Sequence, residues 1–135
     1  MRSGGINWLA VLAAAVAFYL IGFIIYGVLV PEDMWLAMSG DSATEIAAVG
    51  DSRMPFGPLM PIMTALFMAL IFKWGAVAGA GQGVGWALVI ALASAVPATL
   101  YGWVYGVGPI EMTLIDGAHL MLGHAAVGAI LGGWR

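Results

Sequence analysis

The sequence predicts an all-α membrane protein in which four transmembrane helices pack as an antiparallel bundle. Of the 135 residues, 63% are hydrophobic and only 8% are charged, whereas roughly a quarter of the residues in soluble globular domains are charged. Four apolar stretches are long enough to cross the roughly 30 Å hydrocarbon core of a bilayer. The connections between them are short, which favours antiparallel neighbours, and the length suits a single membrane domain over residues 1–135.

The first predicted helix covers residues 6–30, and no charged residue lies between Arg2 and Glu32. Trp8 and Tyr26 lie near its ends, where aromatic side chains anchor a helix at the two membrane–water interfaces. The run is longer than the roughly 7 to 15 apolar residues of a cleavable signal peptide. We therefore expect it to be retained as a membrane span.

Residues 31–55 form the one sizeable extramembrane segment, in which we expect two short surface helices. The first follows the first span directly and ends at Gly40. The second begins with a capping box, in which Ser42 and Glu45 each satisfy a backbone N–H of the other, and it ends at Gly50.

The second and third spans are predicted at residues 56–72 and 85–107. The glycine-rich residues 75–83 between them match no phosphate-loop spacing and follow no strand. They predict a flexible turn whose glycines continue into the close packing of helices. Pro97 lies inside the third span and predicts a kink, since proline cannot donate the helical hydrogen bond. Further interface anchors are expected near the ends of the third and fourth spans, at Trp86, Tyr105 and Trp134.

The fourth span, residues 114–134, carries the intramembrane polar candidates Asp116, His119 and His124. Each is a functional candidate, because a polar group in the membrane costs about 3 kcal/mol unless it finds a partner. His124 is predicted near the midplane. Thr113 and Asp116 match a capping box at the start of the helix, which predicts a structural role for Asp116.

The simplest expectation for both histidines is a hydrogen bond to a neighbouring helix, to Ser94, to Thr99 or to a backbone carbonyl. Their five-residue spacing separates them by about 140° around the helix, so they do not face one metal ion. We expect no metal and no cofactor, and the absence of cysteine excludes thiolate sites. A haem bound between the His124 side chains of two subunits stays open as an alternative.

Small residues recur every four positions on two of the predicted helices. Such steps allow helices to approach closely, either within the chain or with a partner. The positions concerned are Gly102 and Gly106, Ala125 and Ala129, and Gly128 and Gly132.

The distribution of charge predicts the orientation. Arg2, Lys73 and Arg135 share one side, whereas six of the seven acidic residues lie on the other side with Arg53. By the positive-inside rule both termini are cytoplasmic, in the inner (plasma) membrane, and residues 31–55 are extracytoplasmic. The scattered basic residues exclude a nucleic-acid footprint. Similar exits from the first and third spans leave open a parallel duplication of helix pairs.

The sequence also resembles a known family. The resemblance lies in the opening residues 7–12, in Gly22 and Tyr26, in residues 35–40 and in the closing residues 128–135. Together these resemble the bacterial domain of unknown function 1761 family. The resemblance implies a small four-helix integral membrane protein and assigns no activity.

Our leading functional expectation is a non-enzymatic membrane protein that acts through helix contacts, as a homo-oligomer or as an accessory subunit of a larger complex. Its partners would be the lipid bilayer, itself or other membrane subunits, because the chain has almost no soluble surface. The alternative is a small transporter or proton-conducting protein that uses His124 and His119. An intramembrane enzyme or haem protein is the third class.

Overall fold

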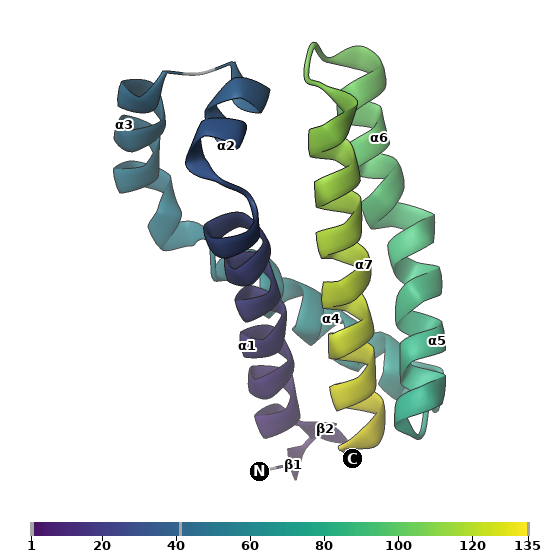
Figure 1. The fold of residues 1–135 in the computed structure, drawn as a ribbon. Helices are drawn as coiled ribbons and strands as arrows, with labels where there is room; N and C mark the ends of the chain where they lie inside the picture. Colours follow the sequence, from purple (N-terminus) through teal and green to yellow (C-terminus); the bar gives the residue numbers. More distant parts are fainter. Residues whose placement is uncertain (1, 41, 135) are drawn as a thin grey trace.

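The computed structural model describes residues 2–40 and 42–134 and is almost entirely helical (Figure 1). Four of its helical stretches are long and apolar enough to cross a membrane, which confirms the all-α class and the number of predicted spans. These stretches are Trp8–Leu29, Met54–Trp74, Ala80–Tyr105 and Ile110–Gly133.

A short hairpin precedes the first span. Strands β1 (Arg2–Ser3) and β2 (Ile6–Asn7) pair antiparallel around Gly4 and Gly5, whose φ angles of 59° and 78° favour glycine. The predicted helix start at residue 6 is therefore wrong by two residues. The reason is that Asn7 ends β2 and also caps the helix, with its side-chain oxygen accepting from the Ala10 N–H.

Helix α1 (Trp8–Ile24) continues as the π-helical segment η1 (Ile25–Leu29) before the chain leaves the span. Helices α2 (Glu32–Ser39) and α3 (Ala43–Arg53) then confirm that this segment contains two short helices.

The ends of these two helices test the predicted caps. Gly40 ends α2 in the left-handed conformation, and both hydrogen bonds of the Ser42–Glu45 capping box are present. The predicted end of the second helix at Gly50 is wrong. Gly50 lies inside α3, which continues to Arg53. The chain then passes directly into η2 (Met54–Phe56), which contains Pro55.

The second span consists of α4 (Leu59–Trp74), and the third of α5 (Ala80–Ile90), η3 (Ala91–Ala95) and α6 (Val96–Tyr105). The π-helical η3 lies directly before Val96 and Pro97, where a kink is predicted, and Pro97 has no N–H to donate to the helix.

The predicted flexible turn is shorter than expected, since α5 begins at Ala80 and not at residue 85. Gly79 donates its N–H to the carbonyl of Gly132 at 2.8 Å, and Gly83 lies inside the helix. The close approach of α7 to Gly79 and Gly83 confirms the helical close packing that these glycines predict.

Helix α7 (Ile110–Gly133) lies at the centre of the molecule, between α1 on one side and α5 and α6 on the other, while α4 passes obliquely behind (Figure 1). The hairpin and the last turn of α7 lie at the same end of the molecule (Figure 1). The core is built mainly from alanine and a few large side chains of α1, α4 and α7. Its members include Ala10, Ala14, Phe18, Ala65, Met68, Phe72, Val127 and Leu131.

Candidate functional site

The candidate site lies where η1 and α1 face α7. The hydroxyl of Tyr26 donates a hydrogen bond to Oδ1 of Asp116, and both side chains are partly buried. This contact joins two candidate spans that are far apart in sequence. It gives the intramembrane carboxylate the partner that burial requires.

The imidazole of His119 lies between two aromatic rings. Its centroid is 5.2 Å from the ring of Phe18 and 5.2 Å from that of Tyr26, both approached edge to face. Gly22 leaves the space for it, since a Cβ at that position would lie 2.9 Å from Nε2 of His119. His119 therefore occupies a slot shaped by one face of α1.

His124 lies deeper in the same interface and is only 6% exposed. Its Nδ1 donates to the backbone carbonyl of Leu120 at 2.7 Å, and its ring packs against Phe18 at 5.5 Å. Phe18 thus contacts both imidazoles, on a face of α1 that also carries Gly22 and that continues into η1 at Tyr26.

The expected hydrogen bond to a neighbouring helix is present for His119, which bonds the backbone of Phe18 on α1. Hydrogen bonds from either histidine to Ser94 or Thr99 are absent among the described residues. The Ser94 hydroxyl donates instead to the carbonyl of Ile90 at 2.7 Å, and that of Thr99 to Val96 at 2.8 Å. Hydroxyls on a helix in an apolar setting satisfy themselves on their own backbone in this way, which leaves the imidazoles to other partners.

The expected capping role of Asp116 is wrong. Helix α7 begins at Ile110 after Pro109, so Asp116 lies more than one turn inside the helix, and Glu111 is the acid of the first turn. The apparent capping box arises because Thr113 follows the true start by one turn. Asp116 is a side chain of the helix face that meets Tyr26.

Three residues of the site escaped the sequence reasoning: Phe18, Gly22 and Tyr26, the last of which was assigned only to the interface. They are spaced by four, and residues at this spacing lie on one face of a helix. The available signal was a bulky ring, a glycine and a phenol placed four residues apart on one helical face. The remaining predicted anchors, Trp8, Trp86, Tyr105 and Trp134, are all exposed side chains.

A cavity of about 840 Å³ lies beyond Tyr26, between η1, α2 and α3, and we call it the α2/α3 cavity. Its aromatic wall is the pair Tyr26 and Trp35, whose rings meet edge to face at 5.9 Å. Tyr26 therefore lines the cavity and also bonds Asp116. The full lining is Tyr26, Gly27, Val30, Glu32, Trp35, Glu45, Val49, Gly50, Arg53 and Met54.

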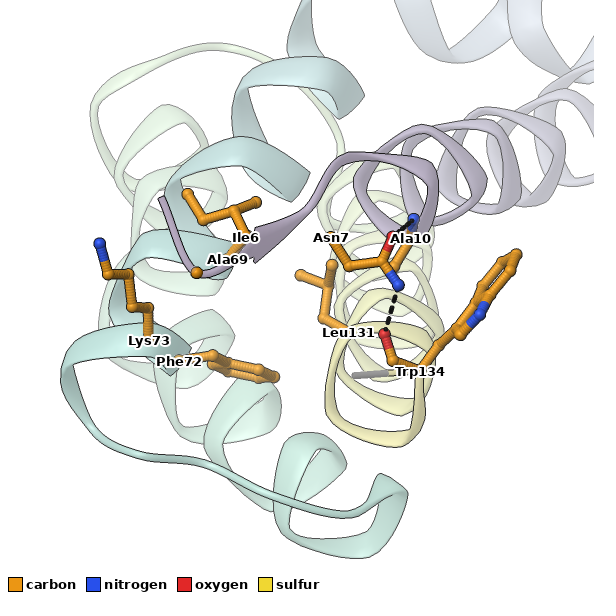
Figure 2. A pocket seen from close by; sticks show the side chains of 9 residues that line it. Ile6, Asn7, Ala10, Ala69, Phe72, Lys73, Leu131 and Trp134 are labelled. Atoms are coloured by element: carbon orange, nitrogen blue, oxygen red, sulfur yellow. Dashed lines mark hydrogen bonds between the residues drawn. The ribbon is translucent and has the colours of Figure 1, made fainter. Parts of the chain in front are cut away.

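A second cavity, of about 300 Å³, lies at the opposite end of α1, and we call it the hairpin cavity (Figure 2). The side-chain amide of Asn7 donates to the carbonyl of Trp134 at 3.0 Å on one side of it, and Lys73 and Phe72 lie on the other (Figure 2). Between the two cavities the interface of α1 and α7 is apolar below His124, where Ala14 and Val127 are fully buried.

The described residues contain no group of three His, Asp or Glu side chains that would hold a metal ion. The arrangement brings a phenol, a carboxylate and two imidazoles to one helix interface. Imidazole is the side chain whose ordinary titration lies nearest to neutral pH.

The predicted packing glycines divide into two groups. Gly128 and Gly132 are buried against α5, where Gly83 and Gly79 face them. Helix α7 therefore serves one interface with its glycines and another with its histidines. Ala125 and Ala129 are half-buried. By contrast, Gly102 faces open space, and a Cβ on Gly106 would meet only its own helix.

Residues 9–132 match the family model described as Protein of unknown function (DUF1761). Neither a curated protein nor a solved structure matches the chain. Because the match covers nearly the whole chain, the protein belongs to the DUF1761 family.

Proposed function

We propose that the protein is a small inner-membrane transporter that moves protons, alone or together with a solute, through the interface of α1 and α7. One observation carries this proposal: Tyr26, Asp116, His119 and His124 follow one another from the α2/α3 cavity towards the buried middle of the molecule. Imidazoles titrate near neutral pH, and chains of His and Asp serve as proton relays in membrane transporters.

The apolar part of the same interface favours a gated carrier over an open pore. From His124 to Leu131, which lines the hairpin cavity, α7 rises by about 10 Å. Val127 lies between them and is fully buried. A proton that reaches His124 from one side therefore waits for a rearrangement of α1 against α7 before it leaves on the other.

The proposed topology is an antiparallel bundle with both termini in the cytoplasm. Lys73 and the hairpin then lie on the cytoplasmic side, and α2 and α3 on the opposite side, in agreement with the positive-inside rule. The relay would open first to the extracytoplasmic side. Reaction of a cysteine at position 78 with an impermeant reagent in intact cells would contradict this orientation.

Purified protein in liposomes loaded with a pH-sensitive dye tests the function directly. An imposed pH gradient should decay faster than in empty liposomes, and His124→Ala and Asp116→Asn should each slow the decay at least tenfold. Ser94→Ala is the matched control, because the Ser94 hydroxyl is exposed and bonds only its own helix. Decay no faster than in empty liposomes would refute the proposal.

A second candidate function is that of a non-enzymatic accessory subunit or a homo-oligomer. The exposure of α6 favours this candidate. None of the ten residues of α6 is buried, and Gly102 faces open space, as a small residue would at a contact with another helix. Gly102→Leu should then abolish co-purification of a partner or a second copy in mild detergent. Unchanged assembly of this variant would exclude α6 as the contact.

A further inference from the structure

The α2/α3 cavity has the features of a ligand site, independent of the proton relay. Its volume of about 840 Å³ lies within the range of small-molecule pockets in proteins, roughly 300 to 1,000 Å³. Such pockets combine apolar walls with a few polar groups that select the ligand. The chemistry of the lining therefore identifies the class of ligand.

The lining combines an aromatic corner with an excess of negative charge. The rings of Tyr26 and Trp35 meet at 77°, and the face of an aromatic ring attracts cations. Glu32 and Glu45 contribute two carboxylates, against the single guanidinium of Arg53.

The carboxylate of Glu45 is held charged by its neighbours. It accepts hydrogen bonds from the backbone N–H and the hydroxyl of Ser42, at 2.9 Å and 2.7 Å, and these lower the pKa of Glu45. The rest of the wall is apolar and includes Val30, Val49 and Met54. An aromatic corner, acidic groups and an apolar wall together suit a cation with hydrocarbon substituents.

We propose that the α2/α3 cavity binds an organic cation, a quaternary or tertiary ammonium that carries apolar substituents. The ammonium lies against the rings of Tyr26 and Trp35, and its substituents contact the apolar wall. Arg53 disfavours the ligand through like charge, whereas an anion or a zwitterion would use Arg53 as a partner. This proposal rests on the cavity alone, and binding is measured without a transport assay. A failure of proton transport would therefore not contradict it.

Calorimetric titration of the purified full-length protein in maltoside micelles tests the proposal. The probe is benzyltrimethylammonium, followed by choline and by 3,3-dimethylbutan-1-ol, which has the shape of choline without its charge. We expect benzyltrimethylammonium to bind more tightly than choline, and the neutral alcohol to bind at least tenfold more weakly than choline. Equal binding of the alcohol and choline would overturn the proposal, because shape alone would then explain it.

Variants locate the site. Trp35→Leu should weaken binding of benzyltrimethylammonium about tenfold, in line with a desolvated cation–π contact, whereas Trp35→Phe should retain most of it. Glu32→Gln should weaken binding about threefold. The matched control is Trp103→Leu on α6, an exposed tryptophan outside the cavity lining, which should bind as the wild type does.

The variant Arg53→Gln distinguishes most clearly between a cationic and a zwitterionic ligand. Its result does not depend on whether the tryptophan variants fold. Removal of the like charge should tighten binding of benzyltrimethylammonium about threefold. Weaker binding in this variant, or tighter binding of phosphocholine than of choline to the wild type, would show that Arg53 recognises an anionic group. Either result would indicate that the ligand is a zwitterion and not an organic cation, and would overturn the proposal.

Discussion

Gly22 lies directly against the imidazole of His119, so that a Cβ on Gly22 would stand 2.9 Å from Nε2. A real Cβ does not come this close to a neighbouring atom, so only glycine at position 22 permits the present orientation of the ring. The orientation matters because the same imidazole packs against Tyr26, whose hydroxyl holds Asp116. A backbone position on α1 thus controls the polar contacts of α7.

Gly22→Ala is therefore expected to displace His119 and loosen the interface of α1 and α7. We expect a loss of about 1 to 3 kcal/mol in the free energy of unfolding, the usual cost of overpacking, even though alanine is the better helix former. Thermal unfolding in detergent measures this loss. Gly117→Ala on α7 is the control, because a Cβ there meets nothing within 4 Å, and it should be neutral or stabilising. An equal effect of both variants would contradict the role of Gly22.

Gly83 makes the comparable contact between α5 and α7. A Cβ on Gly83 would collide with the carbonyl oxygen of Gly128 and would lie 3.1 Å from Cα of Gly132. Because the obstacle is backbone, the helices themselves have to separate. We expect Gly83→Ala to cost at least about 2 kcal/mol of stability, within the range of core overpacking.

Gly85→Ala is the matched control for Gly83→Ala, since it lies two residues further on the same helix and faces open space. It should unfold at or above the temperature of the wild type in the same detergent. Close packing of α5 on α7 would be refuted if Gly83→Ala were as stable as Gly85→Ala.

The spans were predictable from the sequence because they depend on hydropathy averaged over many residues. The surface helices were predictable because a local capping box and Gly40 specify their ends. The start of α5 was not, since a contact between helices fixes it: the N–H of Gly79 finds its acceptor on Gly132, in the last turn of α7. The close packing of Gly79 and Gly83 was predictable, but the residue at which the turn gives way to the helix was not.

Only the α7 side of the candidate site was predictable from the sequence. Asp116, His119 and His124 stand out as polar residues in an apolar helix, whatever surrounds them. Their partners depend on which helix lies opposite, and a single sequence does not state that α1 faces α7. Tyr26 was therefore assigned to the lipid interface by its place near the end of a span, although its hydroxyl bonds Asp116.

The Ser42–Glu45 capping box predicts a pH dependence of α3. Hydrogen bonds from Ser42 lower the pKa of Glu45 below its ordinary value of 4.5. A lowered pKa in the folded state means that the contribution to stability is full above pH 4.5 and is lost as the pH falls through the folded-state value. The start of α3 should therefore be protected at pH 7 and frayed near pH 3.

Hydrogen exchange of the residue 42–53 segment, in wild type and Glu45→Ala, measures this effect. Comparison at the same pH removes the intrinsic pH dependence of exchange. The variant should exchange severalfold faster than the wild type at pH 7 and at nearly the same rate at pH 3. A difference of the same size at both pH values would exclude the ionised carboxylate as its source.

Asn7 holds the two ends of the described chain together and gives the last prediction. Its side-chain oxygen caps α1 by accepting from the Ala10 N–H, while its amide nitrogen donates to the carbonyl of Trp134 at 3.0 Å. Asn7→Ala removes both contacts and should cost about 1 to 2 kcal/mol of stability. Asn7→Asp keeps the capping oxygen and removes only the donor, so its loss should be smaller.

The two variants differ in where protection is lost. In Asn7→Ala, amide exchange should quicken both in the first turn of α1 and in the last turn of α7. In Asn7→Asp, the first turn should keep its protection, because a carboxylate at a helix N-terminus is favoured by the dipole. Only the last turn, up to Trp134, should then exchange faster. Equal loss at both ends in Asn7→Asp would mean that the donor to Trp134, and not the cap, orders the start of α1.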